Sequence, residues 1–291
     1  MNDRALQAAY AHCERLAREH YENFPVASYL LPAAMRPHVA AIYAFARTAD
    51  DFADEPGRQE SERLRLLDDW GARLQGAADG GRPEATDGPS RIFAALGHTI
   101  QECELPLSLF QDLLSAFRQD VMRKRYDSWE DLLDYCRRSA NPVGRLVLRV
   151  AGYRSPALDA QSDAVCTALQ LTNFWQDLER DWQIGRVYVP AADRERTGAR
   201  EDDLAGRRMT PEWQQVMAEM TRRTRHLFAA GRPVCDGVKG RLRWELRLTW
   251  LGATRILDRL EAGNYDVFTR RPKLTAADGP GLIWQALMWR I

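Results

Sequence analysis

Apolar residues recur at intervals of three and four along almost the whole chain. Residues 6–17 and 109–121 show this spacing most clearly, because their leucine, alanine and aromatic positions follow one face of an α-helix. The strict alternation that is typical of strands is nearly absent. The pattern predicts an all-α protein with helices at 3–21, 34–54, 58–78, 89–103, 106–123, 128–138, 142–152, 156–183, 210–230, 236–262 and 280–289.

Three stretches rich in glycine, proline and polar residues interrupt the helical pattern, at 76–90, 185–200 and 263–281. None of them separates regions of different composition, and the sequence contains no repeat of fixed period. A chain of 291 residues is long enough to bury a sizeable core. We therefore expect residues 1–291 to form one domain.

The composition limits the classes of partner and the compartment. Forty-one basic and 41 acidic residues give a formal net charge of zero, so no overall field attracts nucleic acid, and we expect no nucleic-acid partner. The five cysteines are scattered without a CxxC pair, which argues against a disulfide framework or a zinc site. The first residues do not resemble a signal peptide, and no stretch approaches the roughly 20 apolar residues of a spanning helix. We expect a cytoplasmic protein.

The stretch RTADDFADE at 47–55 carries four carboxylates in six positions. On a helix, Tyr43, Arg47, Asp50 and Asp54 form one stripe, with the two aspartates about 6 Å apart along the axis. Like charges at this spacing are unfavourable, and the C-terminal end of a helix also disfavours anions. These acids are therefore either a solvated helix end or a functional group of carboxylates.

A second stripe occurs in LQLTNFWQDLERDW at 169–182, where Gln170, Asn173, Asp177 and Asp181 are three, four and four residues apart. An amphipathic surface helix would explain this stripe alone. Two D-x-x-x-D pairs facing each other across a cavity would repel unless a hard cation lay between them. Mg²⁺ fits, because it takes one or two carboxylates and completes its shell with water and phosphate oxygens.

Such a magnesium clamp would bind a diphosphate and stabilise it as a leaving group, which favours ionisation of an allylic diphosphate. Arginine side chains could bind the remaining phosphate oxygens. Aromatic faces could stabilise a carbocation, although packing explains each ring equally well. The candidates for binding phosphate oxygens are Arg47, Arg123, Lys124, Arg125, Arg186, Arg270 and Arg271. The candidates for stabilising a carbocation are Phe24, Tyr43 and Tyr135.

Three segments resemble the squalene and phytoene synthases, the trans-isoprenyl diphosphate head-to-head synthases: FPVASYLLPAAMRPHVAAIYAFARTADDFADE (24–55), YCRRSANPVG (135–144) and LTNFWQDLERDWQIGRVYVP (171–190). The likeness extends from about His20 to Arg270. It implies an isoprenoid-synthase-type helical bundle with a central apolar cavity and two or three Mg²⁺ ions when substrate is bound. The metal ligands it implies are Asp50, Asp54, Asn173, Asp177 and Asp181. The substrate-binding residues it implies are His20, Phe24, Tyr43, Arg47, Gln170, Asn173, Arg186, Tyr188 and Arg270, with Tyr135 and the aspartates catalytic.

Within this family, ENFPVAS (22–28) and SANPVGR (139–145) are similar to the bacterial hydroxysqualene synthases of the hopanoid route. This implies conversion of presqualene diphosphate and water to hydroxysqualene and diphosphate, without NADPH, and other enzymes of that route as partners. One alternative is a presqualene diphosphate or squalene synthase that starts from farnesyl diphosphate. A non-catalytic scaffold relative is another alternative, but such chains usually lose one acidic pair. A terpene cyclase would have a different second motif.

Two features leave alternatives open. Many relatives have a small residue where this chain has Asn141-Pro142, so Asn141 either orients the attacking water or caps a helix that begins at Pro142. Near the C-terminus, Trp284 and Trp289 lie in an apolar helix that either packs into the core or contacts a membrane surface where the apolar product leaves. In the second case the protein would be peripheral at the inner face of the membrane.

Overall fold

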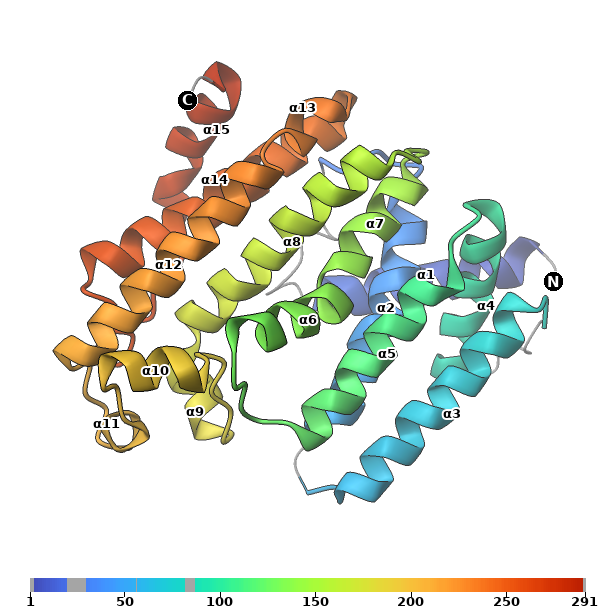
Figure 1. Ribbon diagram of the computed structural model, residues 1–291. Helices are drawn as coiled ribbons and strands as arrows, with labels where there is room; N and C mark the ends of the chain where they lie inside the picture. The colour runs from blue at the N-terminus through green and yellow to red at the C-terminus, as the bar shows by residue number, and fades with distance from the viewer. Residues whose placement is uncertain (1–2, 20–29, 56, 82–86, 290–291) are drawn as a thin grey trace. The chain divides into compact units, whose positions relative to one another are not determined.

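The computed structural model describes residues 3–19, 30–55, 57–81 and 87–289 (Figure 1). These residues form helices without a strand, so the predicted all-α class is confirmed; a single bridge joins Arg125 to Val187. The predicted residues His20 and Phe24 lie outside the described residues. The helices are α1 (Asp3–Glu19), α2 (Arg36–Asp54), α3 (Glu60–Ala78), α4 (Gly88–Glu102), α5 (Leu107–Met122), α6 (Trp129–Ser139), α7 (Asn141–Val150), α8 (Pro156–Gln176), α9 (Leu178–Gln183), α10 (Ala191–Thr197), α11 (Glu201–Ala205), α12 (Pro211–Gly231), α13 (Val234–Gly237), α14 (Gly240–Ala262), η2 (Ala276–Asp278) and α15 (Gly279–Met288).

Local sequence signals explain where several helices begin. The side chain of Asp87 accepts a hydrogen bond from the Ser90 amide at 2.7 Å at the start of α4, and Ser128 accepts one from the Asp131 amide at 3.1 Å at the start of α6. Proline occupies the first turn of α2, α4, α12 and α15, where its missing N–H costs nothing. Gly198 ends α10 with a φ of 82°, a conformation that favours glycine.

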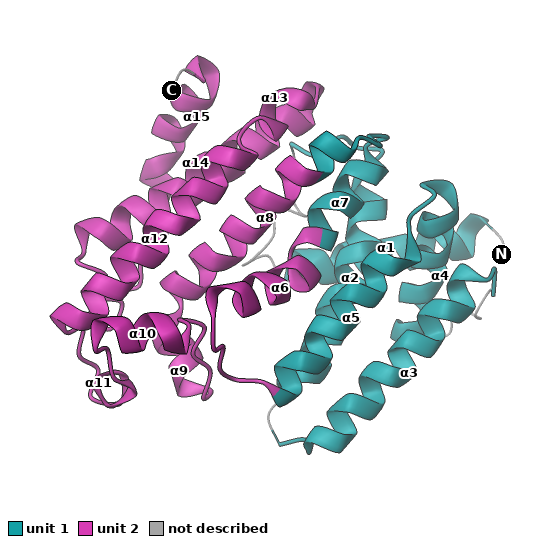
Figure 2. Cartoon of the chain, viewed as in Figure 1, with its two compact units in different colours: residues 1–122, 142–159 teal, residues 123–141, 160–291 magenta. Residues whose placement is uncertain are grey.

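The chain divides into two compact units (Figure 2). Unit 1 comprises residues 1–122 and 142–159, and unit 2 comprises residues 123–141 and 160–291. Neither unit is a continuous stretch of sequence, since the chain passes between them at 122–123, 141–142 and 159–160. The single domain expected from the sequence stays a prediction.

In unit 1, helix α2 packs against α1, α3, α4 and α5. Phe45 of α2 lies at the centre of an aromatic cluster, 5.5 Å edge-to-face from Phe110 and 6.2 Å from Phe93, ring centre to ring centre. The Trp70 indole donates a buried hydrogen bond to the Phe45 carbonyl at 3.3 Å. This packing fixes the helix that carries the first acidic pair.

In unit 2, helix α14 packs against α12, α13 and α15, and tryptophans join the long helices by hydrogen bonds. The Trp175 indole of α8 donates to the Thr224 hydroxyl of α12 at 2.8 Å, and the Trp250 indole of α14 donates to the Phe228 carbonyl at 2.9 Å. Gly231 lets the end of α12 approach α8 so closely that an added Cβ would lie 2.6 Å from the Gln161 carbonyl oxygen. These contacts fix α8, which leads into the second acidic pair.

The structure corrects three predicted elements. The helix expected at 156–183 is divided by a bend at Asp177, and the helix expected at 236–262 is α13 followed by α14. The stretch 185–200, expected to be irregular, contains α10. Apolar spacing did not reveal the bend at Asp177, because the Asp181 N–H still bonds the Asp177 carbonyl at 2.9 Å and the helical spacing continues through the bend. Helices of five to seven residues, such as α10, are shorter than the window in which periodicity is visible.

All five cysteines are free thiols in the structure. Burial raises the pKa of the Cys13 and Cys235 thiols to about 12, so both are unreactive near neutral pH. Among the described helices, none combines the length and the apolar character needed to cross a membrane.

Candidate active site

The first acidic motif lies on α2 in unit 1. Arg47 contacts Asp51 at 2.7 Å and Asp50 at 3.7 Å, so its closer partner is the aspartate outside the predicted stripe. Asp54, at the last position of α2, is exposed. Tyr43 is half-buried, and burial raises the pKa of its phenol while Arg47 opposes that effect, so the phenol stays protonated near neutral pH. The helix therefore presents a neutral hydroxyl, one guanidinium and three carboxylates.

The second acidic motif lies in unit 2, at the bend between α8 and α9. Asp177 has φ −104° and ψ 13° and precedes α9, so Gln170, Asn173, Asp177 and Asp181 do not lie on one unbroken helix as expected. The spacing nevertheless persists, because the Asp177 N–H bonds the Asn173 carbonyl at 2.8 Å. Asp181 follows one turn later and is half-buried, with its Oδ2 atom shielded from solvent.

Arg271 is the closer of two basic residues at this motif, since Arg180 lies 3.8 Å from the Asp177 carboxylate. The Arg271 Nε and Nη2 atoms donate to the two carboxylate oxygens of Asp177 at 2.5 and 2.9 Å. The Gln176 side chain also donates to the Pro272 carbonyl, so the chain after Arg271 is tied to the same bend. Arg270, which the family resemblance implied as substrate-binding, is exposed, and the adjacent Arg271 makes the contact with Asp177.

Aromatic side chains from three segments of unit 2 form a buried cluster. Phe174 of α8 stacks on Tyr188 with ring centres 3.6 Å apart and planes 6° apart. Tyr135 of α6 lies 6.1 Å from both rings, and Tyr126 lies 5.6 Å from Tyr135. The structure thus brings together the predicted residues Tyr135 and Tyr188, and adds Phe174 and Tyr126, which the sequence interpretation did not select.

Asn141 is the first residue of α7, so this helix begins one residue earlier than the capping alternative requires. Its Oδ1 atom accepts a hydrogen bond from the Thr167 hydroxyl of α8 at 2.9 Å, and Asn141 is buried. The amide is therefore oriented by a neighbouring helix. Thr167 is a partner that no sequence motif indicated.

Among the remaining predicted residues of unit 2, Gln170, Asn173 and Arg186 are half-buried. Of the basic candidates at 123–125, Arg123 pairs with Asp131 and Arg125 pairs with Glu201, while Lys124 is exposed. The Arg186 N–H donates to the Asp181 carbonyl at 2.7 Å, which places the start of the GRVYVP segment directly after the second motif. Gly185 allows this turn with a φ of 79°. Backbone hydrogen bonds therefore connect Asn173, Asp177, Asp181 and Arg186 in succession.

The carboxylates on α2 and around Asp177 fit magnesium by their chemistry. They are hard oxygen donors in pairs one helical turn apart, and Mg²⁺ commonly takes one or two carboxylates and keeps water or phosphate oxygens in its other positions. No group of three or more acidic, histidine or cysteine side chains suited to a metal occurs in the described part of the chain. The facing of the two acidic pairs across a central apolar cavity stays a prediction, because one pair belongs to each unit.

Comparison with known proteins agrees with these motifs. The sequence profile of the squalene/phytoene synthase family matches residues 17–278. A hydroxysqualene synthase from Rhodopseudomonas palustris is 36% identical over 242 residues, which cover 82% of this chain and 80% of that protein. A 15-cis-phytoene synthase from Synechocystis sp. is 30% identical over 279 residues, which cover 92% of this chain and 81% of that protein.

A solved structure is similar in both fold and sequence. The squalene synthase HpnC from Alicyclobacillus acidocaldarius superposes with a TM-score of 0.82 at 42% identity, covering 89% of this chain and 95% of that one. The matched region of the family profile includes both acidic motifs, the Asn141 segment and Arg271. This chain is therefore a member of the squalene/phytoene synthase family of head-to-head isoprenoid synthases.

Proposed function

We propose that this enzyme converts presqualene diphosphate and water to hydroxysqualene and diphosphate in a magnesium-dependent reaction. The observation that carries the proposal is the retention of both acidic pairs, Asp50 with Asp54 and Asp177 with Asp181, each beside an arginine. The 36% identity to a protein named hydroxysqualene synthase supports the choice of substrate and product.

The reaction needs no external oxidant or reductant. The bond between the cyclopropylcarbinyl carbon and the diphosphate oxygen breaks, and both electrons leave with the diphosphate. Opening of the cyclopropane moves the positive charge to the carbon that water attacks, and the water releases one proton as the C–O bond forms. The protein must therefore bind the leaving group, accommodate a cation and admit one water molecule.

Arg47 and Arg271 bind the leaving group in this proposal. Both guanidinium groups already donate hydrogen bonds to carboxylates, at 2.7 Å to Asp51 and at 2.5 Å to Asp177, and can donate the same bonds to diphosphate oxygens. Magnesium, held by Asp50, Asp54, Asn173, Asp177 and Asp181, would supply Lewis-acid stabilisation of the diphosphate charge. Asp54 suits the role of metal ligand because it is exposed at the end of α2.

In this proposal the buried aromatic cluster stabilises the cation and Asn141 orients the water. The faces of Tyr135, Phe174 and Tyr188 can stabilise positive charge through their quadrupoles. An amide oxygen has two acceptor positions, and Thr167 uses one of those on Asn141 Oδ1. The second position can accept a hydrogen bond from water and leave the water lone pair free to attack.

The test is incubation of the purified enzyme with Mg²⁺ and presqualene diphosphate in H₂¹⁸O, followed by mass spectrometry of the lipid product. We expect an alcohol that carries one ¹⁸O atom. A hydrocarbon product, or recovery of unchanged presqualene diphosphate, would contradict the proposal.

The second candidate function is condensation of two prenyl diphosphates. It is favoured by the 30% identity to a 15-cis-phytoene synthase over 92% of the chain, and reduction onward to squalene is favoured by the name of the similar solved structure. Parallel incubations with farnesyl diphosphate, with and without NADPH, distinguish these outcomes. Presqualene diphosphate without NADPH or squalene with NADPH would support the second candidate.

A further inference from the structure

Helix α15 is apolar on both of its faces. Leu282 and Ala286 are buried in a cluster with Leu251 of α14. With about 100° between successive residues of a helix, the outer side chains span an arc of about 140° opposite that buried pair. These outer side chains and their exposed fractions are Ile283 (54%), Trp284 (63%), Leu287 (57%) and Met288 (44%).

This outer face differs from an ordinary surface helix, which is polar toward solvent. Helix α15 contains no charged residue. Among the described residues, seven large apolar side chains are exposed, and four of them lie on these ten residues. A contiguous apolar patch of this kind usually marks a surface for a partner or a membrane.

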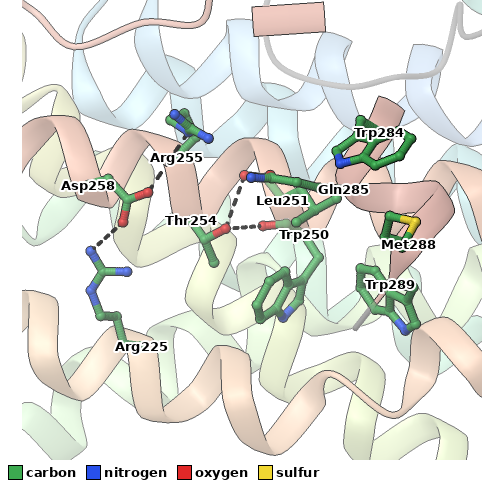
Figure 3. Close-up of a pocket in the computed structure, with 10 residues that line it drawn as sticks. All are labelled: Arg225, Trp250, Leu251, Thr254, Arg255, Asp258, Trp284, Gln285, Met288 and Trp289. Atoms are coloured by element: carbon green, nitrogen blue, oxygen red, sulfur yellow. Dashed lines mark hydrogen bonds and ion pairs between the residues drawn. The ribbon is translucent and has the colours of Figure 1, made fainter. Parts of the chain in front are cut away.

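A pocket of about 420 Å³ lies between α12, α14 and α15, beside this face (Figure 3). Trp250, Trp284, Met288 and Trp289 form its apolar wall, and Arg255 lies at the end away from the tryptophans. Arg225 and Arg255 both pair with Asp258 in this pocket, which therefore combines a wall suited to hydrocarbon with an ion-paired edge. Indole rings beside basic side chains are typical of residues at a membrane interface.

The end of α15 is joined to a basic segment. The Trp289 indole donates to Asp236 at 3.0 Å, and the Arg232 guanidinium lies 4.6 Å from the Trp289 ring centre. Residues 232–247 hold five cations against two carboxylates, in a chain whose formal net charge is zero. Lys239 and Arg241 are exposed at the start of α14, where the helix dipole disfavours cations. Helix stability therefore does not account for them.

We propose that α15 and the basic segment 232–247 dock on the surface of an anionic phospholipid bilayer. Ile283, Trp284, Leu287 and Met288 insert among the outer acyl chains, while Lys239 and Arg241 contact lipid phosphates. A second copy of this chain fits less well, because pairing the same faces would bring the two basic segments together. All of these residues belong to unit 2, and the docking does not depend on the proposed reaction.

The test is flotation of the full-length protein with vesicles of phosphatidylcholine alone or mixed with phosphatidylglycerol. We expect binding to the mixed vesicles that weakens as salt is added, because headgroup attraction is screened. The double variant Trp284→Ser/Leu287→Ser should lower vesicle affinity by about tenfold or more, since it removes two inserting apolar groups. Lys239→Glu/Arg241→Glu should lower binding to the mixed vesicles only.

The matched control is Met122→Ser, which removes an exposed apolar side chain of α5 that is 68% exposed. We expect its vesicle binding to equal that of the parent protein, and far-UV circular dichroism should show that all three variants keep their helices. Two results would overturn the proposal: no binding to the mixed vesicles, or a loss of vesicle binding in Met122→Ser equal to that in Trp284→Ser/Leu287→Ser. So would a dimer, detected by light scattering, that Trp284→Ser/Leu287→Ser converts to monomers.

Discussion

Arg271 holds the carboxylate of Asp177 in a two-point ion pair, with donor–acceptor distances of 2.5 and 2.9 Å. The Asp177 side chain is only 12% exposed, so this pair is screened less than one on the surface. Asp177 is also a proposed magnesium ligand. Arg271 and the metal therefore compete for the same carboxylate when no diphosphate is present.

Replacing Arg271 with glutamine should tighten metal binding in the absence of substrate while weakening catalysis. We expect the Mn²⁺ dissociation constant, measured by electron paramagnetic resonance, to fall several-fold because Asp177 loses its closer competing cation and keeps only Arg180 at 3.8 Å. The kcat/KM should fall about 10- to 100-fold, since hydrogen bonds to charged groups contribute about 1.5–3 kcal/mol.

The matched control is Arg270→Gln, which removes the same charge from an exposed neighbour. Its Mn²⁺ affinity in the absence of substrate should stay within about twofold of the parent value. Equal effects of the two substitutions would show that overall charge, and not the Asp177 contact, is responsible.

Asp54→Asn should abolish most activity without unfolding the protein. Asp54 is exposed at the end of α2, so the free energy of unfolding should change by no more than about 0.5 kcal/mol. Loss of one charge at the leaving-group site should lower kcat by about 10²–10³-fold. The control is Asp51→Asn, which changes an aspartate outside the stripe that is bonded to Arg47, and it should lower kcat by less than tenfold. A larger loss in the Asp51 variant would show that Asp51, and not Asp54, binds the metal.

Asn141→Gly tests whether the amide directs water capture. If Asn141 orients the water, the fraction of alcohol among the products of presqualene diphosphate should fall. Thr167→Val, which removes the 2.9 Å hydrogen bond but keeps the shape, should lower the fraction in the same direction and to a smaller extent. An unchanged alcohol fraction in the glycine variant would leave Asn141 with only a structural role.

Most of the helices could be predicted because their signals are local. Apolar spacing, proline in first turns and capping side chains such as Ser128 depend on a few adjacent residues. The bend at Asp177 could not be predicted, because the residues that meet it, Arg271 and Pro272, lie about a third of the chain away. Long-range partners leave no periodic trace in the sequence.

For the candidate site, too, local signals were visible in the sequence and long-range partners were not. The sequence singled out the acidic pairs, since unfavourable like charges at helical spacing are visible in one stretch, and the family resemblance added Tyr135. The sequence did not indicate that Arg47 lies closer to Asp51 than to Asp50, or that Phe174 stacks on Tyr188. For α15, an apolar helix pattern is equally consistent with burial and exposure, and only the structure showed that Trp284 faces outward.

A buried polar network in unit 1 should make stability depend on pH. The Tyr10 hydroxyl lies 2.9 Å from His98 Nδ1, 2.9 Å from Thr99 Oγ1 and 3.2 Å from His38 Nδ1. Thr99 Oγ1 also lies 3.0 Å from His38 Nδ1, so one neutral chain, from His38 through Thr99 and Tyr10 to His98, gives each hydrogen bond a donor and an acceptor. Burial raises the Tyr10 pKa to about 12, so this phenol stays protonated.

Burial, together with the neighbouring His98, lowers the pKa of His38 below its usual 6.5, although Glu102 opposes the shift. The unfolded chain therefore binds this proton more readily than the folded one, and the contribution of His38 to stability is complete above about pH 6.5 and is lost as the pH falls below it. Urea denaturation between pH 5 and 8 should show a free energy of unfolding that rises with pH. In His38→Gln the free energy of unfolding should depend less steeply on pH. His12, whose pKa is also lowered, should leave a residual slope. An unchanged slope would show that His38 is not the group responsible.

Gly231→Ala should destabilise unit 2 because α12 and α8 are in contact at this residue. The added methyl group would lie 2.6 Å from the Gln161 carbonyl oxygen and 2.8 Å from the Val165 backbone nitrogen, so the helices must move apart. Overpacking of this kind costs about 1–3 kcal/mol, which should appear as a lower Tm in calorimetry. Gly76→Ala in α3 is the control, because an added Cβ there meets nothing within 4 Å and alanine favours a helix by about 0.5–1 kcal/mol. The two substitutions should therefore shift the Tm in opposite directions, and a rise in both would show that α12 and α8 are not as close as the structure indicates.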